Sequence, residues 1–279
     1  MHYAIIITTP DFAGLNIKEQ LCQLYPFNET GKKFEGYEIL EHVSNSNKSS
    51  PTKITLYTTN ERCISCEDYD KKIDADIFIF PTTHRSAAGT HSLCVHVQGN
   101  WGNADLGGIP CNLSVAHAPL LKEFFKVLHK KASHLDEEIT MEATHHGPRI
   151  EKPTVFLEIG SDESQWKRAD LGKMWADVIM DVVTKEIPPH PSAIGIGGTH
   201  YCANLNKIQL GTDIAIGHVC AKYALASLTK EMLVQAIEKT IPRPELAILD
   251  WKALGTEKDR IIEILDEIGF EWKKTKDMK

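Results

Sequence analysis

The sequence predicts an α/β protein, a three-layer sandwich of helices around a mostly parallel mixed sheet. Two observations predict it. Short apolar stretches that favour strands alternate with longer stretches whose apolar residues recur at helical spacing, and no internal repeat is visible. The 279 residues suffice for one large domain or two small ones. We expect a single catalytic α/β unit over residues 1–279, with 129–138 (HKKASHLDEE) as the best candidate for a subdomain joint, since a helix ends there in a polar run.

The predicted strands are short apolar or alternating stretches that end at polar residues or glycine. The stretch at 3–8 is typical of a buried strand, that at 76–80 is continuously apolar, and that at 93–98 alternates. In chain order the predicted strands comprise residues 3–8, 53–58, 76–80, 93–98, 139–143, 155–159, 193–196 and 247–250.

The predicted helices carry an apolar face. Around 120–128, for example, the leucines and phenylalanines fall on one side of a helix. Asp162 and Gln165 have the spacing of a capping box at the start of a long helix. In chain order the predicted helices comprise residues 16–24, 120–128, 162–184, 219–239 and 256–268, and polar or glycine-rich loops are expected at 44–51 and 100–110.

Charge and composition argue against several classes of protein. A formal charge of −7 disfavours a large basic surface for nucleic acid, although a few lysines suffice to contact one end of an RNA. No stretch approaches the ~20 apolar residues that cross a bilayer, and the N-terminus lacks the basic region of a signal peptide. We therefore expect a cytoplasmic monomer that does not bind a membrane. The 7 cysteines favour free thiols, and Cys63-x-x-Cys66 is interpreted as two loop thiols rather than a metal knuckle.

The 13 histidines are unusually abundant, and several follow predicted strands. The segments after four strands contain His84, then His145 and His146, then Gly160-Ser161, and then the run GGTHY at 197–201. In open α/β sheets a ligand lies beyond the carboxyl ends of the strands. If these four strands are parallel neighbours, the histidines converge on one rim of the sheet, where we expect the active site.

Imidazole can ligate zinc or move protons near neutral pH, so His145 and His146 are the first candidates for both tasks. The chain leaves the sheet at Gly147-Pro148, which lets both rings reach one site; alternatively, one ring caps backbone groups. The glycine pair before His200 favours a substrate or oxyanion loop over a tight turn alone. His96, on an alternating strand, is either a satisfied core residue or part of the site.

Glu142 and Glu158 lie at the ends of two strands that lead to the expected site. A carboxylate there can orient an imidazole or act as a base, or it can pair with a nearby lysine or arginine. The chain has no GxSxG elbow, P-loop or HExxH motif. A histidine-rich hydrolytic site remains, in which a bound metal activates the water nucleophile.

Three segments closely resemble signature blocks of the archaeal and plant type of D-aminoacyl-tRNA deacylase. They are EATHHGP at 142–148, FLEIGS at 156–161 and GIGGTHY at 195–201. The segments at 84–86 and 93–100 resemble two further blocks, and those at 11–17 and 251–252 resemble weaker ones. The resemblance spans nearly the whole chain in the right order.

The resemblance implies a hydrolase that cleaves the ester between a D-amino acid and the terminal ribose of tRNA, spares the L-ester, clears N-alkylated D-aminoacyl adducts and uses zinc. It implies a fold related to peptidyl-tRNA hydrolase and nucleoside phosphorylases, and the acceptor end of D-aminoacyl-tRNA as partner. The expected catalytic residues are His145, His146, Glu142 and His200; the metal ligands are a subset of His84, His96, His145, His146 and His200; and the substrate-binding residues are Gly197, Gly198, Tyr201, Asn100 and Ser161.

Two other classes of function remain open. One is a metal-dependent nucleosidase or amidohydrolase that acts on a small molecule. The other is a non-catalytic binding module with a structural metal, which is disfavoured because structural zinc sites are rich in cysteine and the cysteines here lie mostly outside the histidine motifs.

Overall fold

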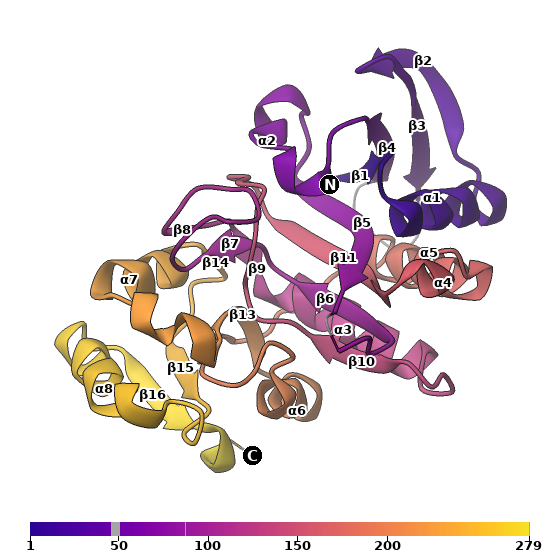
Figure 1. Cartoon of the computed structure of the whole chain (residues 1–279). Helices are drawn as coiled ribbons and strands as arrows, with labels where there is room; N and C mark the ends of the chain where they lie inside the picture. The colour runs from indigo at the N-terminus through magenta and orange to yellow at the C-terminus, as the bar shows by residue number, and fades with distance from the viewer. Residues whose placement is uncertain (46–50, 87, 279) are drawn as a thin grey trace.

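The structure is a computed structural model that describes residues 1–45, 51–86 and 88–278. Most of the loop predicted at 44–51 lies outside these ranges. Within them, an eight-stranded mixed sheet has the order β10-β6-β11-β5-β1-β4-β3-β2, and its four central strands are parallel (Figure 1). Its strands are β1 (His2–Thr8), β2 (Asn28–Phe34), β3 (Tyr37–Ser44), β4 (Thr52–Thr59), β5 (Ile77–Arg85), β6 (Ser92–His96), β10 (Glu138–Met141) and β11 (Thr154–Ser161).

Strand β1 is apolar throughout because both of its faces are buried. Alternate residues such as Ile5 pack with the helices α1 (Phe12–Leu24), α3 (Ala118–Lys131) and α5 (Ala169–Val183) in one core. The intervening residues, such as Ile6, pack on the opposite face with Tyr69 of the short helix α2 (Tyr69–Lys72). Helices thus cover one face of the large sheet, and a smaller cluster covers the other.

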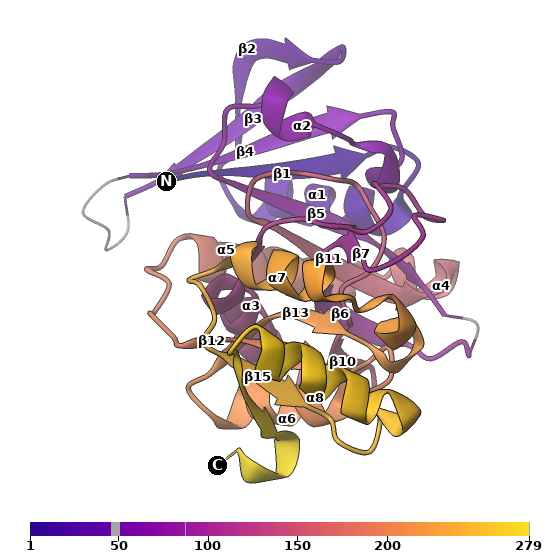
Figure 2. The same ribbon diagram turned by 90° about the vertical axis from the view of Figure 1, so that its left-hand side faces the viewer.

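A second sheet follows in the C-terminal part of the chain. It has the order β13-β12-β15-β16, and its strands are all parallel. Helices α7 and α8 contribute to the core on one face and α6 to the core on the other. In Figure 2 strands β1 to β5 of the large sheet lie above the second sheet, and its edge strands β6 and β10 lie beside the second sheet. The elements are β12 (Ser192–Ile196), α6 (Ala203–Gly211), β13 (Ala215–Cys220), α7 (Lys230–Glu238), β15 (Leu246–Leu249), α8 (Lys258–Glu267) and β16 (Glu271–Lys274).

One short two-stranded ladder and a buried lysine join the two parts. In this ladder β9 (Ala116–His117), just before α3, pairs with β14 (Thr240–Ile241), whereas the ladder of β7 (Gly99–Asn100) with β8 (Asn112–Leu113) lies within the loop region 99–113. Lys122 of α3 is buried, and its ammonium donates to the carbonyls of Gln209, Thr212 and Ile214 at the end of α6 and the loop after it. The ammonium is thus solvated by backbone of the second part of the chain.

The mixed α/β class with a large, mostly parallel sheet is confirmed, and most predicted elements are present. Two helix predictions were wrong. The helix predicted at 162–184 is two helices, α4 (Glu163–Trp166) and α5, because the backbone of Arg168 is extended between them. The helix predicted at 219–239 begins as strand β13, turns through a 3₁₀ segment at Lys222–Ser227, and becomes α-helical only after Thr229, whose hydroxyl caps α7.

Sequence analysis did not predict the hairpin β2–β3, helix α6, or strands β13 and β16. The hairpin lies at the sheet edge, where its side chains are mostly exposed or half-buried, so its sequence carries little apolar alternation. Among the described residues, no helix has both the length and the apolar character needed to cross a membrane.

Candidate active site

The five candidate histidines come together, but not at one rim of four parallel strands. Only β5 and β11 are parallel neighbours; β10 runs antiparallel to them across β6, and β12 belongs to the second sheet. The rings instead meet at the junction between the sheets. The ring centroid of His145 lies 4.4 Å from that of His96, 4.3 Å from that of His146 and 4.6 Å from that of His200. The expected convergence is present, and the expected strand arrangement behind it was wrong.

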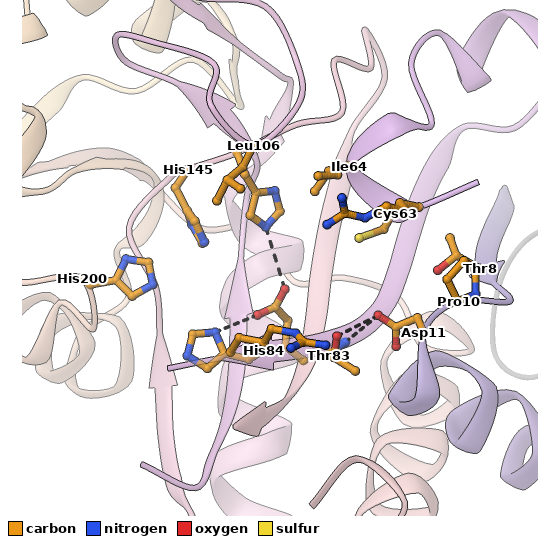
Figure 3. Close-up of a pocket in the computed structure, with 14 residues that line it drawn as sticks. Thr8, Pro10, Asp11, Cys63, Ile64, Thr83, His84, Leu106, His145 and His200 are labelled. Atoms are coloured by element: carbon orange, nitrogen blue, oxygen red, sulfur yellow. Dashed lines mark hydrogen bonds and ion pairs between the residues drawn. The ribbon is translucent and has the colours of Figure 1, made fainter. Parts of the chain in front are cut away.

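Four of these rings, those of His84, His145, His146 and His200, line a cavity of about 400 Å³, and fully buried His96 lies behind them. Figure 3 shows His84, His145 and His200 on one side of it and Asp11 with Thr83 on the other. Both carboxylate oxygens of Asp11 already accept hydrogen bonds within the fold. One caps α1 at the Gly14 amide, and the other accepts from the backbone N–H and the hydroxyl of Thr83. The reactive groups therefore lie on the histidine side.

Three of the imidazoles are fixed by the backbone in the same way. The Nδ1 atoms of His96, His145 and His146 donate to carbonyl oxygens at 3.3, 2.8 and 2.5 Å. A ring held through Nδ1–H presents its Nε2 lone pair to the site, as metal-ligating histidines do. One ring nitrogen from each of the three residues lies within 4.8 Å of the others.

Two buried carboxylates lie among the rings and differ in their hydrogen bonds. Glu158 accepts from the Thr82 hydroxyl at 3.0 Å and from His84 Nδ1 at 3.2 Å. Burial raises the pKa of Glu158, but hydrogen bonds from His146, His84 and His96 outweigh it and hold that pKa well below its usual range. Glu158 is therefore a firmly held anion.

Glu142, in contrast, has a fully buried side chain whose two carboxylate oxygens take part in no hydrogen bond among the described residues. They lie 3.1 Å from His84 Nδ1, 3.5 Å from His200 Nε2 and 3.8 Å from His145 Nε2. A buried carboxylate that accepts no hydrogen bond is stabilised by a positive charge beside it, which here is either a proton on a neighbouring ring such as His84 or a bound metal ion.

The donor set fits a metal ion. His84, Glu142 and His200 form a second group of three within 4.8 Å, and His96, Glu142 and Glu158 form a third. Imidazole nitrogen and carboxylate oxygen are the donors that zinc takes in catalytic sites. These residues can therefore hold a zinc-like cation.

The charges of the carboxylates also divide the histidines into two kinds. Burial lowers the pKa of His84 and His96, but their contacts with Glu158 and Glu142 outweigh it, so both pKa values are raised. Burial and the neighbouring rings of His146, His96 and His200 hold the pKa of His145 well below its usual range. Without a metal, His84 and His96 carry the compensating protons, and His145 stays neutral.

The residues predicted to bind substrate lie around the cluster in different settings. The Tyr201 hydroxyl contacts His84 Nε2 at 3.0 Å. Asn100 donates to the Gly107 carbonyl at 2.9 Å and lines an adjoining cavity of about 390 Å³ that also contacts His145 and His146. Asn100 thus holds the 100–110 loop against the site.

The other three predicted substrate-binding residues, Gly197, Gly198 and Ser161, do not line the main cavity. The Gly197 amide already donates to the Cys220 carbonyl. The Ser161 hydroxyl is buried without a hydrogen-bond partner among the described residues. An oxyanion role for Gly198 stays a prediction, and Gly197 has no free amide for it in this structure.

Sequence reasoning missed several residues that shape the site. Thr144 is bonded to the backbone of Val219 and to Nδ1 of buried His218, which fixes the chain just before His145. Exposed Tyr223 contacts His200 Nδ1 at 3.3 Å. A histidine inside the apolar run 215–220 was a signal for His218; the position of Tyr223 follows from the unpredicted turn after β13.

The close approach of two backbone segments explains why residue 147 is a glycine. A Cβ atom there would lie 2.2 Å from the Gly108 nitrogen, so only glycine lets the 100–110 loop pack against the segment that carries both histidines. The same loop places Leu106 between the two cavities, since Leu106 lines both.

Comparison with known proteins identifies the family of this chain. Residues 71–273 match the family model described as D-aminoacyl-tRNA deacylase. The D-aminoacyl-tRNA deacylase of Pyrococcus furiosus is 33% identical over 277 residues, which cover 96% of this chain and 98% of that protein. That of Archaeoglobus fulgidus is 34% identical over 282 residues, covering 99% and 97%. A solved structure titled as a conserved protein of unknown function, AF0625, matches with a TM-score of 0.88 and 33% identity, covering 100% of this chain and 96% of that one. This chain belongs to the D-aminoacyl-tRNA deacylase family.

Proposed function

We propose that the protein hydrolyses the ester bond of D-aminoacyl-tRNA and releases the free D-amino acid and tRNA. Family membership supplies the reaction class, and the cluster of five histidines and two glutamates beside an open cavity supplies the groups for it. The observation that carries the proposal is Glu142, a buried carboxylate without hydrogen-bond donors that faces imidazole nitrogens.

We propose zinc as the cofactor, held by His96, His145 and His146, with His84, Glu142 and His200 as the neighbouring donor set. Bound zinc supplies a Lewis acid that polarises a carbonyl and makes water more acidic. The fixed Nδ1–H bonds of the three histidines support this assignment, because each one orients a neutral ring toward the site.

The roles of the two glutamates follow from their hydrogen bonds. Glu158 is already held by Thr82 and His84, so we assign it to orient the rings of His84 and His96. Glu142 has unoccupied lone pairs inside the site, so it is the group placed to accept a proton from the attacking water. His200 is partly exposed and lies between Glu142 and Tyr223 at the opening, where a leaving ribose oxygen would need a proton.

The experiment charges tRNA separately with D-tyrosine and L-tyrosine and follows ester loss with zinc, with a chelator, and after zinc is restored. We expect loss of the D-ester alone, abolished by the chelator and regained with zinc. H145A and H146A should each lower the rate by at least about 100-fold, and H134A, a matched change of a histidine that lines neither cavity described above, should not. Equal loss of the D- and L-esters, or wild-type rates in both site variants, would refute the assignment.

A further arm tests the finer substrate range. N-ethyl-D-tyrosyl-tRNA in the same assay should be cleaved if the protein also clears N-alkylated adducts. Free nucleosides and acyl amides in place of tRNA test the small-molecule alternative, for which we expect no turnover.

A further inference from the structure

Two arginines of the main cavity have no acidic partner. Arg62, just before the 3₁₀ turn Cys63–Ser65, and Arg85, the last residue of β5, both line the cavity that holds His145 and Glu158. Both are exposed, and neither has a carboxylate within ion-pair distance among the described residues.

Of the other arginines, Arg149, Arg168 and Arg260 each pair with one or more carboxylates, and Arg243 has no such pair among the described residues but lies away from this cavity. Two guanidinium groups therefore stay available at the main cavity, beside the reactive cluster. Guanidinium is weakly hydrated and matches planar or tetrahedral oxyanions with paired donors.

Arg85 is also held in place. Its guanidinium lies 4.7 Å from the ring centre of Trp166, and the indole N–H of Trp166 donates to the carbonyl of His84 at 3.1 Å. The same tryptophan thus supports the backbone of a cluster histidine and the side chain of the next residue. This fixes where a positive charge lies relative to the site.

The proposed substrate offers few anions to such groups. The carboxyl group of the amino acid is neutral as an ester, and its α-amino group is a cation. The anions that accompany every such ester are the phosphodiesters of the acceptor strand. A carboxylate ligand would require an acidic amino-acid side chain, which is not common to the substrate class.

We propose that Arg62 and Arg85 bind the phosphate on the 5′ side of the terminal adenosine and so seat the ester against the histidine–glutamate cluster. This inference rests on the proposed function. It explains how an acidic protein holds tRNA: the contact is local, at the cavity, and involves one or two phosphates rather than a basic face.

The test compares two small esters with D-tyrosyl-tRNA, using the zinc-loaded full chain. One is 2′(3′)-O-D-tyrosyl-adenosine, and the other is the same ester of adenosine 5′-monophosphate. The measured quantity is the ratio of kcat/KM for the phosphorylated ester to that for the unphosphorylated one. We expect a ratio of about 10–100 in the wild type, since charged hydrogen bonds of this kind contribute about that factor.

R62A and R85A should each lower this ratio about 10-fold, mainly through KM, and R62A/R85A should bring it close to one. R85K should retain part of the ratio, because lysine keeps the charge but not the paired donors. R243A is the matched control, since Arg243 does not line this cavity, and its ratio should equal that of the wild type. With D-tyrosyl-tRNA, each alanine variant should also reduce the salt dependence of kcat/KM by about one phosphate contact.

The results separate the two proposals. Variants that lower kcat/KM for both small esters by the same factor, or a wild-type ratio near one, would overturn the phosphate assignment. A wild-type protein that cleaves none of the three D-esters would overturn the proposed function instead. Because the unphosphorylated ester reports folding and chemistry in each variant, a misfolded variant is recognised by its loss of both activities.

Discussion

Replacing Glu142 by glutamine should stabilise the metal-free protein and reduce the additional stabilisation that zinc provides. Without metal, the Glu142 side chain is fully buried and its oxygens have no hydrogen-bond donor among the described residues. Glutamine removes the buried charge and keeps the volume. At alkaline pH, where His84 and His96 have lost their compensating protons, a buried carboxylate costs more than a carboxamide of the same shape, so the metal-free E142Q protein should be more stable than the wild type by about 1–3 kcal/mol.

Bound zinc offsets this gain. A ligand at 1,000 times its Kd stabilises a protein by about 4.1 kcal/mol. Loss of a group that supports the metal typically weakens its binding about 10–100-fold, so the stabilisation by zinc in E142Q should be smaller by about 1.4–2.7 kcal/mol.

The assay is thermal unfolding of both proteins at alkaline pH, in chelator and in excess zinc, where about 1 kcal/mol corresponds to about 2–4 °C in Tm for a chain near this size. The control is E137Q, which removes a buried carboxylate that has a partner, Arg168. E137Q should be destabilised to the same extent in both conditions. If E142Q lowers Tm in chelator, or gains as much from zinc as the wild type, the reasoning about Glu142 is wrong.

Three further predictions concern the scaffold around the site. K122M leaves three carbonyl groups without their donor and should lower the free energy of unfolding by about 2–4 kcal/mol. Urea denaturation measures this change. K126M, on the surface of the same helix, is the control and should change the free energy of unfolding by less than about 0.5 kcal/mol. Burial lowers the pKa of His218 to about 4, so between about pH 6.5 and 4 the unfolded chain binds a proton there and the folded chain does not. The free energy of unfolding should therefore fall by up to about 3 kcal/mol as the pH drops from about 6.5 to 4. H218Q should flatten that part of the curve of unfolding free energy against pH. G147A should displace the 100–110 loop and reduce the rate of deacylation at least about 10-fold. G211A is the control, since its added Cβ meets no atom within 4 Å, and it should retain wild-type activity. Equal activities of the two variants would contradict the packing described for Gly147.

The sequence predicted the residues of the site better than their arrangement. Strands such as β1 and β11 could be predicted from their apolar runs, because both of their faces are buried. The histidine motifs could be assigned to one site because polar residues directly after strands tend to meet at a sheet edge.

What could not be predicted depends on long-range pairing. Nothing local indicates that β10 pairs with β6, or that β12 lies in a separate sheet, since these choices rest on contacts between residues far apart in the chain. For the same reason His96 could not be distinguished from a core histidine: its strand alternates normally, and only the approach of Glu158 and His145 gives it a role. The free amide expected at Gly197 was lost to the Cys220 carbonyl, a contact made by the unpredicted strand β13.

The division of the cluster between two sheets has a consequence for the order in which the protein matures. His96, His145 and His146 are all synthesised before β11, whereas the set of His84, Glu142 and His200 is incomplete until residue 200 has left the ribosome. The segment just before His145 is bonded to His200 and to Val219 of β13, so a nascent chain that has folded only its large sheet lacks both the wall that carries His200 and Tyr223 and the backbone that fixes His145. If zinc binds as proposed, the complete metal site and the opening beside it both form only when the second sheet has docked, so metal loading and activity on tRNA should begin together in the finished chain.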